Sequence, residues 1–311
     1  MSAGLRFGNG STLYPVLTSL PEGESFGDRQ PKEEIFNSSG TWSHPGATTI
    51  TSVDVLIVGG GGGGGGGQGN FLGGAGGGGG VRRMSVPVSS TPGSYTVTIG
   101  AGGALGGSGT APGAVGGTTS FGPTSVGGGG LGRSGKDPST GATLSDAPAT
   151  GGGGGATTTA PADYGSGSYF NTDPLAGARR AGKGGSYGFP AGVSGSGGGT
   201  GGGGAGGTGN YQTGGHQGGK GLYGYGGGAS GAGDPSPNGM RFYSGASDGG
   251  AGTLANPAHT GPMYPWYSNG IPNTGGGGVG GNSVYVPPST YPGFTQGSAG
   301  GSGLVVVRWW E

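Results

Sequence analysis

The side chains that could carry catalysis are few and lie far apart. The histidines His44, His216 and His259 have no acidic neighbour at the spacing of a catalytic triad or a metal site. Five aspartates stand beside proline or in turn-like contexts, where a carboxylate commonly bonds to nearby backbone: Asp137, Asp146, Asp163, Asp173 and Asp234. No pair of acids is placed for glycoside cleavage. We therefore expect no catalytic residue, no bound metal and no cofactor, and we predict that the protein is not an enzyme.

One stretch imitates a nucleotide site. Residues 55–61, Val-Leu-Ile-Val-Gly-Gly-Gly, look like the strand and glycine turn of a dinucleotide-binding fold. That fingerprint needs a helix directly after the glycines and an acid about 20 residues further on. Residues 68–80 are too rich in glycine to form the helix, and residues 81–90 contain no acid. We therefore reject a nucleotide site.

The aromatic residues give the better functional signal. All but two of the 13 tyrosines lie within residues 164–291, and Tyr and Trp combine a large rigid contact area with a polar tip. Residues 263–271 are the first candidate, because prolines and a Ser-Asn-Gly turn flank the tryptophan there. The predicted receptor-binding residues are Tyr264, Trp266, Tyr267, Tyr223, Tyr225, Phe242 and Tyr243. The alternative is that these side chains cap the ends of glycine segments or build small local cores.

Charge and hydropathy exclude several partner classes. The 13 basic and 13 acidic residues balance, and no cluster of Lys and Arg suits nucleic acid. The longest apolar run is far shorter than the roughly 20 residues of a membrane span, so we expect no membrane insertion. The N-terminus lacks the apolar stretch of a signal peptide. With no cysteine, disulfides are excluded.

The elements that must position any site are strands. Glycine supplies 95 of the 311 residues and proline 22, so helices are disfavoured and the apolar core must be small. Period-two alternation predicts strands at residues 53–58 and 95–99, a weaker one at 81–88, and a last one at 304–311. Residues 41–50 read as extended, with a turn at Pro45-Gly46. The fold class is all-β or irregular, with a small antiparallel sheet of early strands and the C-terminal strand clamping a glycine-rich insertion.

The insertion begins with nine consecutive glycines, residues 59–67. Polyglycine in the threefold left-handed conformation rises about 3.1 Å per residue and makes no bonds within itself. Its amides and carbonyls must therefore bond to neighbours, which can come close because glycine has no Cβ. We expect a bundle of polyglycine II rods. Glycine runs recur without one fixed period along the chain, which argues against collagen.

Composition divides the chain into four regions. Residues 1–35 are predicted to be an N-terminal arm or docking segment, with one helical turn starting at Pro31. Residues 36–126 form the strand-rich start of the glycine-rich domain. Residues 127–303 are the glycine-rich insertion with aromatic loops, and residues 304–311 are the closing strand.

The order of motifs at both ends carries a family resemblance. The motifs are Ser39-Gly40-Thr41-Trp42, Pro45-Gly46, the strand before the glycine run, Val86-Pro87-Val88, Pro92-Gly93-Ser94-Tyr95-Thr96-Val97-Thr98-Ile99-Gly100-Ala101-Gly102-Gly103, Gly116-Gly117-Thr118-Thr119-Ser120-Phe121-Gly122 and Gly303-Leu304-Val305-Val306-Val307. Together they resemble the glycine-rich domain of bacteriophage tail proteins. A looser similarity, of texture only, is to the polyglycine-rich tail-fibre-tip adhesins of T-even-like phages.

These resemblances imply a tail fibre or spike component at the exterior of a virion. Its partners would be a host cell-surface receptor, either a glycan or an outer-membrane protein, and other virion proteins joined through residues 1–35. Such fibres are commonly homotrimers, and Trp309-Trp310 is the expected subunit contact. The alternatives are a structural or decoration protein of the virion that binds no receptor, and a cellular glycine-rich structural or ice-binding protein.

Overall fold

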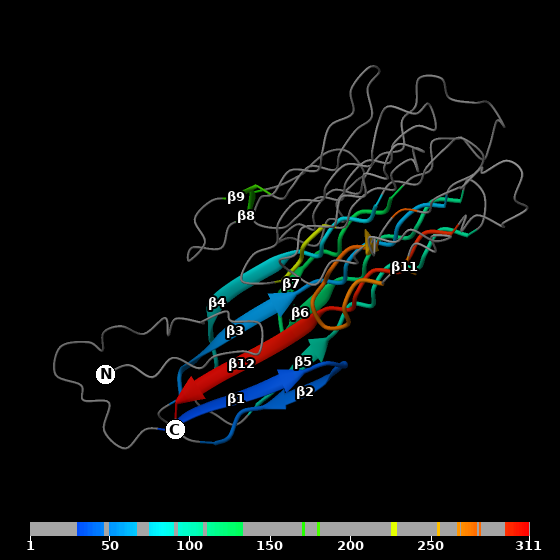
Figure 1. The fold of residues 1–311 in the computed structure, drawn as a ribbon. Helices are drawn as coiled ribbons and strands as arrows, with labels where there is room; N and C mark the ends of the chain where they lie inside the picture. The colour runs from blue at the N-terminus through cyan, green and yellow to red at the C-terminus, as the bar shows by residue number, and fades with distance from the viewer. Residues whose placement is uncertain are drawn as a thin grey trace, which may run out of the picture.

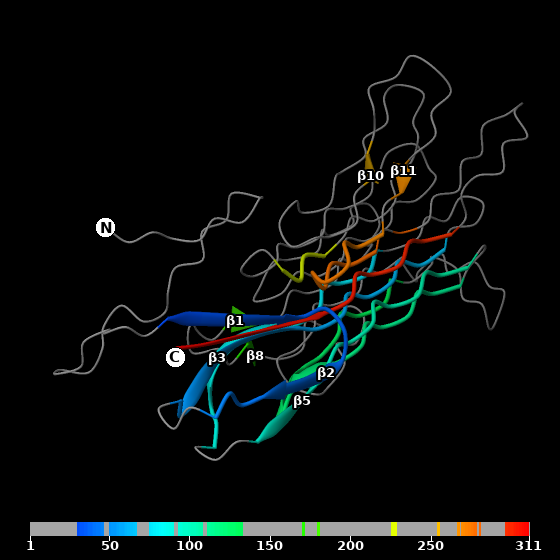
Figure 2. The same cartoon turned by 90° about the horizontal axis from the view of Figure 1, so that it is seen from below.

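The computed structural model describes residues 30–46, 50–66, 75–89, 93–107, 111–132, 225–228, 269–278, 280 and 296–310, and the backbone of four further two-residue strands. Within these residues the secondary structure is all β, with no helix. Strands gather at one end of the described structure and thin, nearly parallel chain segments leave them toward the other end (Figures 1 and 2). The all-β expectation is confirmed.

The first sheet joins the two ends of the described chain. Its strand order is β1-β12-β3-β4 and every pair is antiparallel. Its strands are β1 (Pro31–Phe36), β12 (Leu304–Trp310), β3 (Ser52–Val58) and β4 (Val81–Pro87). The last strand lies between β1 and β3, with Leu304 opposite Val58. The predicted pairing of early strands with the C-terminal strand is therefore confirmed.

A second sheet corrects the expectation of a single one. Its order is β2-β5-β6-β7, again antiparallel throughout. Its strands are β2 (Gly40–Ser43), β5 (Ser94–Thr98), β6 (Thr119–Phe121) and β7 (Thr124–Val126). Two short pairs stand apart, β8 (Phe170–Asn171) with β9 (Arg179–Arg180) and β10 (Leu254–Ala255) with β11 (Trp266–Tyr267).

The helical turn predicted at Pro31 is wrong. Residues 31–36 form β1, which pairs with β12 along its whole length, from Pro31 opposite Trp310 to Phe36 opposite Val305. The strand partner is more than 260 residues away, and local sequence rules cannot see it. Because β1 is an edge strand, the missing N–H of Pro31 and the charges of Lys32 and Glu34 suit its position.

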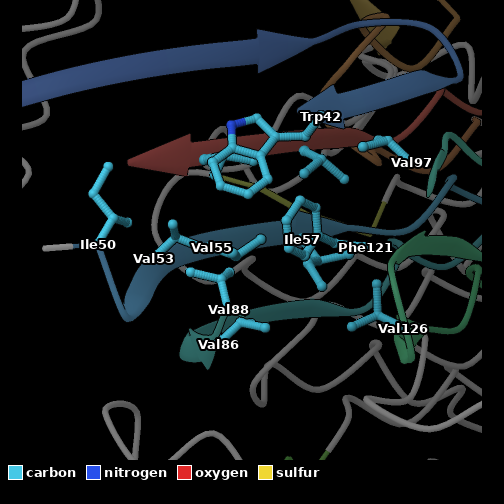
Figure 3. Packing of buried hydrophobic residues seen from close by; sticks show 12 residues of the cluster. Trp42, Ile50, Val53, Val55, Ile57, Val86, Val88, Val97, Phe121 and Val126 are labelled. Carbon is cyan, nitrogen blue, oxygen red and sulfur yellow. The ribbon is translucent and has the colours of Figure 1, made fainter. Parts of the chain in front are cut away.

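The two sheets pack face to face over a small apolar core. Val53, Val55 and Ile57 of β3 point into it, as their period-two spacing predicts. Trp42 and Phe121 of the second sheet meet them and are fully buried (Figure 3). The intervening Leu56 and Val58 are also buried, in a separate cluster. Both faces of β3 are therefore apolar, in agreement with its sequence pattern.

Seven glycine-rich segments, here called rods, continue from this sandwich. We define rod 1 as residues 59–66, rod 2 as 75–80, rod 3 as 100–107, rod 4 as 111–117, rod 5 as 127–132, rod 6 as 275–278 and rod 7 as 297–303. Rod 1 extends β3, rods 3 and 5 follow β5 and β7, and rods 2, 4 and 7 lead into β4, β6 and β12. Each of these six rods is thus held at one end by a strand.

Rod 1 lies at the centre of the bundle, and its successive N–H groups donate to three different rods in turn. The N–H groups of Gly59, Gly60 and Gly61 donate to carbonyls of rods 2, 4 and 7 respectively. Gly62, Gly63 and Gly64 repeat the same order. A repeat of three residues is the signature of the threefold left-handed helix. In the other direction, carbonyls of rod 1 accept N–H bonds from rods 3, 5 and 6.

The six outer rods form a closed ring around rod 1. In the order 2, 5, 4, 3, 7 and 6, each rod is hydrogen-bonded to the next, and rod 6 is bonded back to rod 2. The register of these bonds shows that neighbours in the ring run in opposite directions. All of the inter-rod N···O distances lie between 2.7 and 3.1 Å. The expected polyglycine II bundle is confirmed as one complete hexagonal shell.

The loss of side chains explains why strands give way to rods. Packed sheets stand about 10 Å apart because side chains fill the space between them. Beyond Val58, the chain has no side chain, so segments from both sheets approach and bond directly to each other. A Cβ built on Gly62 would lie only 1.9 Å from the carbonyl oxygen of Gly130. The rods therefore require glycine wherever they face one another.

We predict that Gly62→Ala destabilises the fold by about 1–3 kcal/mol or more, the usual range for overpacking. The added methyl must push rod 5 away and break inter-rod bonds. The matched control is Gly107→Ala, because a Cβ there meets only the Cβ of Ala111, at 3.9 Å. Urea unfolding of both variants measures the difference. Equal midpoints for Gly62→Ala and Gly107→Ala would show that the rods do not pack in this way.

Candidate binding surface

Of the seven predicted receptor-binding residues, only Tyr225 has a described side chain. Trp266 and Tyr267 form β11, paired with β10, and only their backbone is described. Tyr223, Phe242, Tyr243 and Tyr264 lie outside the described residues. The structure therefore tests neither their grouping nor their exposure, and the proposed receptor contact stays a prediction.

Tyr225 lies against the outer face of the first sheet. It packs on a buried cluster made by Leu56, Val58, Val81, Leu304 and Val306. Directly after it, Gly226 has a positive φ of 68°, and a Cβ there would come within 2.9 Å of the side chain of Val81. Glycine thus lets the chain turn closely over the sheet. Tyr225 covers a local apolar cluster, which is the alternative role considered for the aromatic residues.

A row of charges crosses the same face beside this cluster. Glu33 of β1 is opposite Arg308 of β12, and Arg308 is opposite Asp54 of β3. Arg83 of β4 completes the row, with its Nη2 and Nε 2.5 and 3.0 Å from Asp54 Oδ2. Arg308 Nε is paired with Glu33 Oε2. The four strands therefore present alternating negative and positive side chains, a pattern that aligns the strands as well as neutralising the buried Arg83.

The charge row also acts on the tyrosine. Burial raises the pKa of the Tyr225 phenol, because the apolar surroundings disfavour the phenolate. The nearby guanidinium of Arg308 lowers this pKa and the carboxylate of Glu33 raises it. The net effect is a raised pKa, so the phenol keeps its proton at neutral and mildly alkaline pH. The surface offers an aromatic ring, a hydroxyl and paired charges, which suits noncovalent contact.

The second aromatic group lies inside the sandwich. The ring of Trp42 contacts those of His44, Tyr95, Phe121 and Trp309, with centroids 5.6 to 5.9 Å apart. Its indole Nε1 is buried without a hydrogen-bond partner in the described structure, so packing alone holds the side chain. Trp309 is partly buried and packs against the core of the sandwich. The contact between Trp309 and Trp42 was not predicted from the sequence, because the order of strands in the sheets decides which aromatic residues meet.

His44 has a structural role in the turn after β2. Its Nδ1 accepts a bond from the N–H of Gly46 at 3.0 Å, and its Nε2 is 3.0 Å from the carbonyl oxygen of Ile50. These contacts fit the tautomer that carries its proton on Nε2. The imidazole closes the turn that follows β2. His216 and His259 lie outside the described residues.

The first glycines after β3 bond to other rods. In a dinucleotide site their N–H groups would point at the pyrophosphate. Here the N–H groups of Gly59, Gly60 and Gly61 donate to the carbonyls of Gly80, Gly117 and Gly301.

Within the described residues there is no helix of the length and hydropathy needed to cross a bilayer.

We predict that ionisation of Tyr225 destabilises the protein at high pH. Because its pKa is raised in the folded state, its contribution is fully present below the ordinary value of 10.0 and is lost as pH rises through the folded pKa. Tyr225→Phe keeps the ring and removes the ionisable group. The free energy of unfolding, measured by urea at increasing pH, should therefore fall less in the variant above pH 10. Parallel curves for the two proteins would contradict this assignment.

Family comparison agrees with the architecture. A family model of a glycine-rich domain matches residues 37–310, which begins just after β1 and ends with β12. Among curated proteins no sequence matches the chain. The extent of the family match shows that the chain belongs to the glycine-rich domain family.

Proposed function

We propose that the protein is an adhesin at the exterior of a bacteriophage particle, as part of a tail fibre or spike. In this role the rod bundle is a rigid support and the aromatic segments bind a host cell-surface receptor. The receptor would be a glycan or an outer-membrane protein. Residues 1–35 would join the protein to other virion proteins.

The observation that supports this proposal is how the aromatic segments connect to the bundle. Residues 281–295, which include Tyr285, Tyr291 and Phe294, leave from rod 6 and return to rod 7. Residues 229–268 end next to Asn269, whose Oδ1 accepts the N–H of Ala299 in rod 7 at 3.1 Å. Just before residues 229–268, the carbonyl of Gly227 accepts the N–H of Gly277 in rod 6. Both ends of each segment are therefore attached to a bonded array. Fixed ends reduce the entropy lost when a segment binds.

Binding by such a protein would rest on multivalency. A particle carries many copies of an exterior protein, so modest affinity at each site still gives firm attachment. A rigid scaffold keeps the sites oriented toward the cell. The same bundle would also suit a virion protein without a receptor, and cell binding separates these two functions.

We predict that replacing Tyr264, Trp266 and Tyr267 with alanine weakens binding to host cells while leaving the fold intact. Aromatic side chains dominate recognition surfaces, and losing a central one typically costs about 2 kcal/mol or more. The measurement is inhibition of phage adsorption by the purified protein. Tyr14→Ala is the matched control, since Tyr14 lies outside the insertion. Unchanged inhibition by the triple variant would remove these residues from the site, and no inhibition by the unaltered protein would remove the receptor function.

Assembly is tested separately. We expect a homotrimer, so light scattering should give about three times the chain mass of 29.1 kDa. Replacing Trp310 with alanine should lower that mass if the C-terminal strand forms the subunit contact. Trp309 is unsuitable for this test, because it packs against Trp42 inside the sandwich. A single-chain mass for the unaltered protein would refute the trimer.

A further inference from the structure

The rods of the hexagonal ring differ in how far they are exposed to solvent. Every residue of rods 1, 2, 5 and 6 is buried, apart from the partly exposed Leu131. Rods 3 and 4, which are neighbours in the ring, are exposed along one side. We call this side the open flank and define it by its exposed residues Ala101, Ala104, Leu105, Pro112 and Val115.

Burial on the open flank follows the threefold repeat of the rods. In rod 4, Gly113 and Gly116 are buried while Pro112 and Val115 are exposed. In rod 3, Gly100, Gly103 and Gly106 are buried while Ala101 and Ala104 are exposed. The buried positions are all glycine, and none of the exposed positions is. This period of three is difficult to detect in the sequence, because it spans only a few repeats in each rod.

The buried glycines show what a Cβ does between rods. A Cβ on Gly103 would lie 2.1 Å from the carbonyl oxygen of Ala114, and one on Gly116 would lie 2.0 Å from that of Gly60. Ordinary contact begins at 3.4 Å. A rod held away by that difference cannot keep an N–H···O bond of about 2.9 Å. A residue with a Cβ therefore cannot replace Gly103 or Gly116 at the present spacing of the rods.

The open flank still has hydrogen-bonding groups to offer. Within the described part of the chain, the N–H groups of Ala101, Ala104 and Val115 donate to no backbone carbonyl. Pro112 has no N–H, so proline costs nothing at this position. Rods 3 and 4 would thus be able to bond a further rod if their outward side chains were absent. A second copy of this chain would supply such rods, because glycine runs recur along the sequence.

We propose that the side chains of Ala101, Ala104, Pro112 and Val115 end the polyglycine lattice and so prevent rods of a second copy from adding to the open flank. On this flank the bundle stops at one shell of rods, because each exposed position of rods 3 and 4 carries at least a Cβ. The device is the counterpart, in a rod bundle, of the charges and prolines that protect the edge of a β-sheet.

An apolar contact surface would have the opposite consequence. Leu105 and Val115 are 41% and 45% exposed, and such side chains often hold subunits together. If they did so here, replacing apolar residues with glycine would weaken association. If they are steric stops, the same replacement strengthens it. The sign of the change therefore decides between the two roles.

The test is the variant Ala101→Gly, Ala104→Gly, Pro112→Gly and Val115→Gly in the full chain. We expect its mass by light scattering to rise with concentration to at least twice that of the unaltered protein. The matched control, Ala101→Ser, Ala104→Ser, Pro112→Ala and Val115→Thr, keeps every Cβ and should retain the unaltered mass. A glycine variant that keeps the unaltered mass at every concentration overturns the proposal, as does equal association of the control.

A measurement on the unaltered protein keeps the proposal testable if the glycine variant fails to fold. Amide hydrogen exchange should be slow at Gly103, Gly106 and Gly116 and at least tenfold faster at Ala101, Ala104 and Val115. Equal protection at both sets would mean that another chain already covers the flank, and the proposal would be wrong. Neither measurement involves cell binding, so its result is independent of the adhesin function.

Discussion

The structure depends on the absence of Cβ atoms where backbones meet. A peptide group buried away from water must find a hydrogen-bond partner, and an isolated polyglycine chain has none within itself. In this protein, rod 1 finds its partners in six surrounding rods. A single methyl on Gly61 or Gly62 would meet a carbonyl oxygen at about 2 Å. Glycine is therefore the building material of the interior, in the place that apolar side chains take in most proteins.

The sandwich and the bundle satisfy backbone hydrogen bonds and fill their interiors in two different ways. In the sandwich, backbone bonds lie within each sheet and apolar side chains such as Trp42 and Ile57 fill the space between the sheets. In the bundle, backbone bonds point in all directions and no space is left. Ordering a residue costs about 1–2 kcal/mol, and a hydrogen bond returns about 0.5–1.5 kcal/mol. Rods alone are thus marginal, and the strands that hold their ends make the array cooperative.

Sequence patterns predicted much of this architecture. Period-two alternation located β3, β4, β5 and β12, and the long glycine run identified rod 1. The errors came from contacts between distant residues. The local signal at Pro31 favoured a helical turn, but pairing with β12 made this segment a strand. One sheet was expected where two exist, because the short strands β6 and β7 have too few residues to show a period. Of the aromatic residues that were predicted to bind a receptor, only Tyr225 has a described side chain, and it packs against the first sheet.

The sequence by itself determined that this chain would use backbone hydrogen bonds in place of a large apolar core, since 95 glycines leave few side chains to bury. It also determined where rods would begin, at the point where β3 runs out of side chains. The tertiary structure alone decided the order of rods around the ring and which glycines face a neighbour. It likewise decided that Arg83 pairs with Asp54 and that Tyr225 covers the sheet. These features depend on register between segments far apart in the chain, which no local pattern of residue types contains.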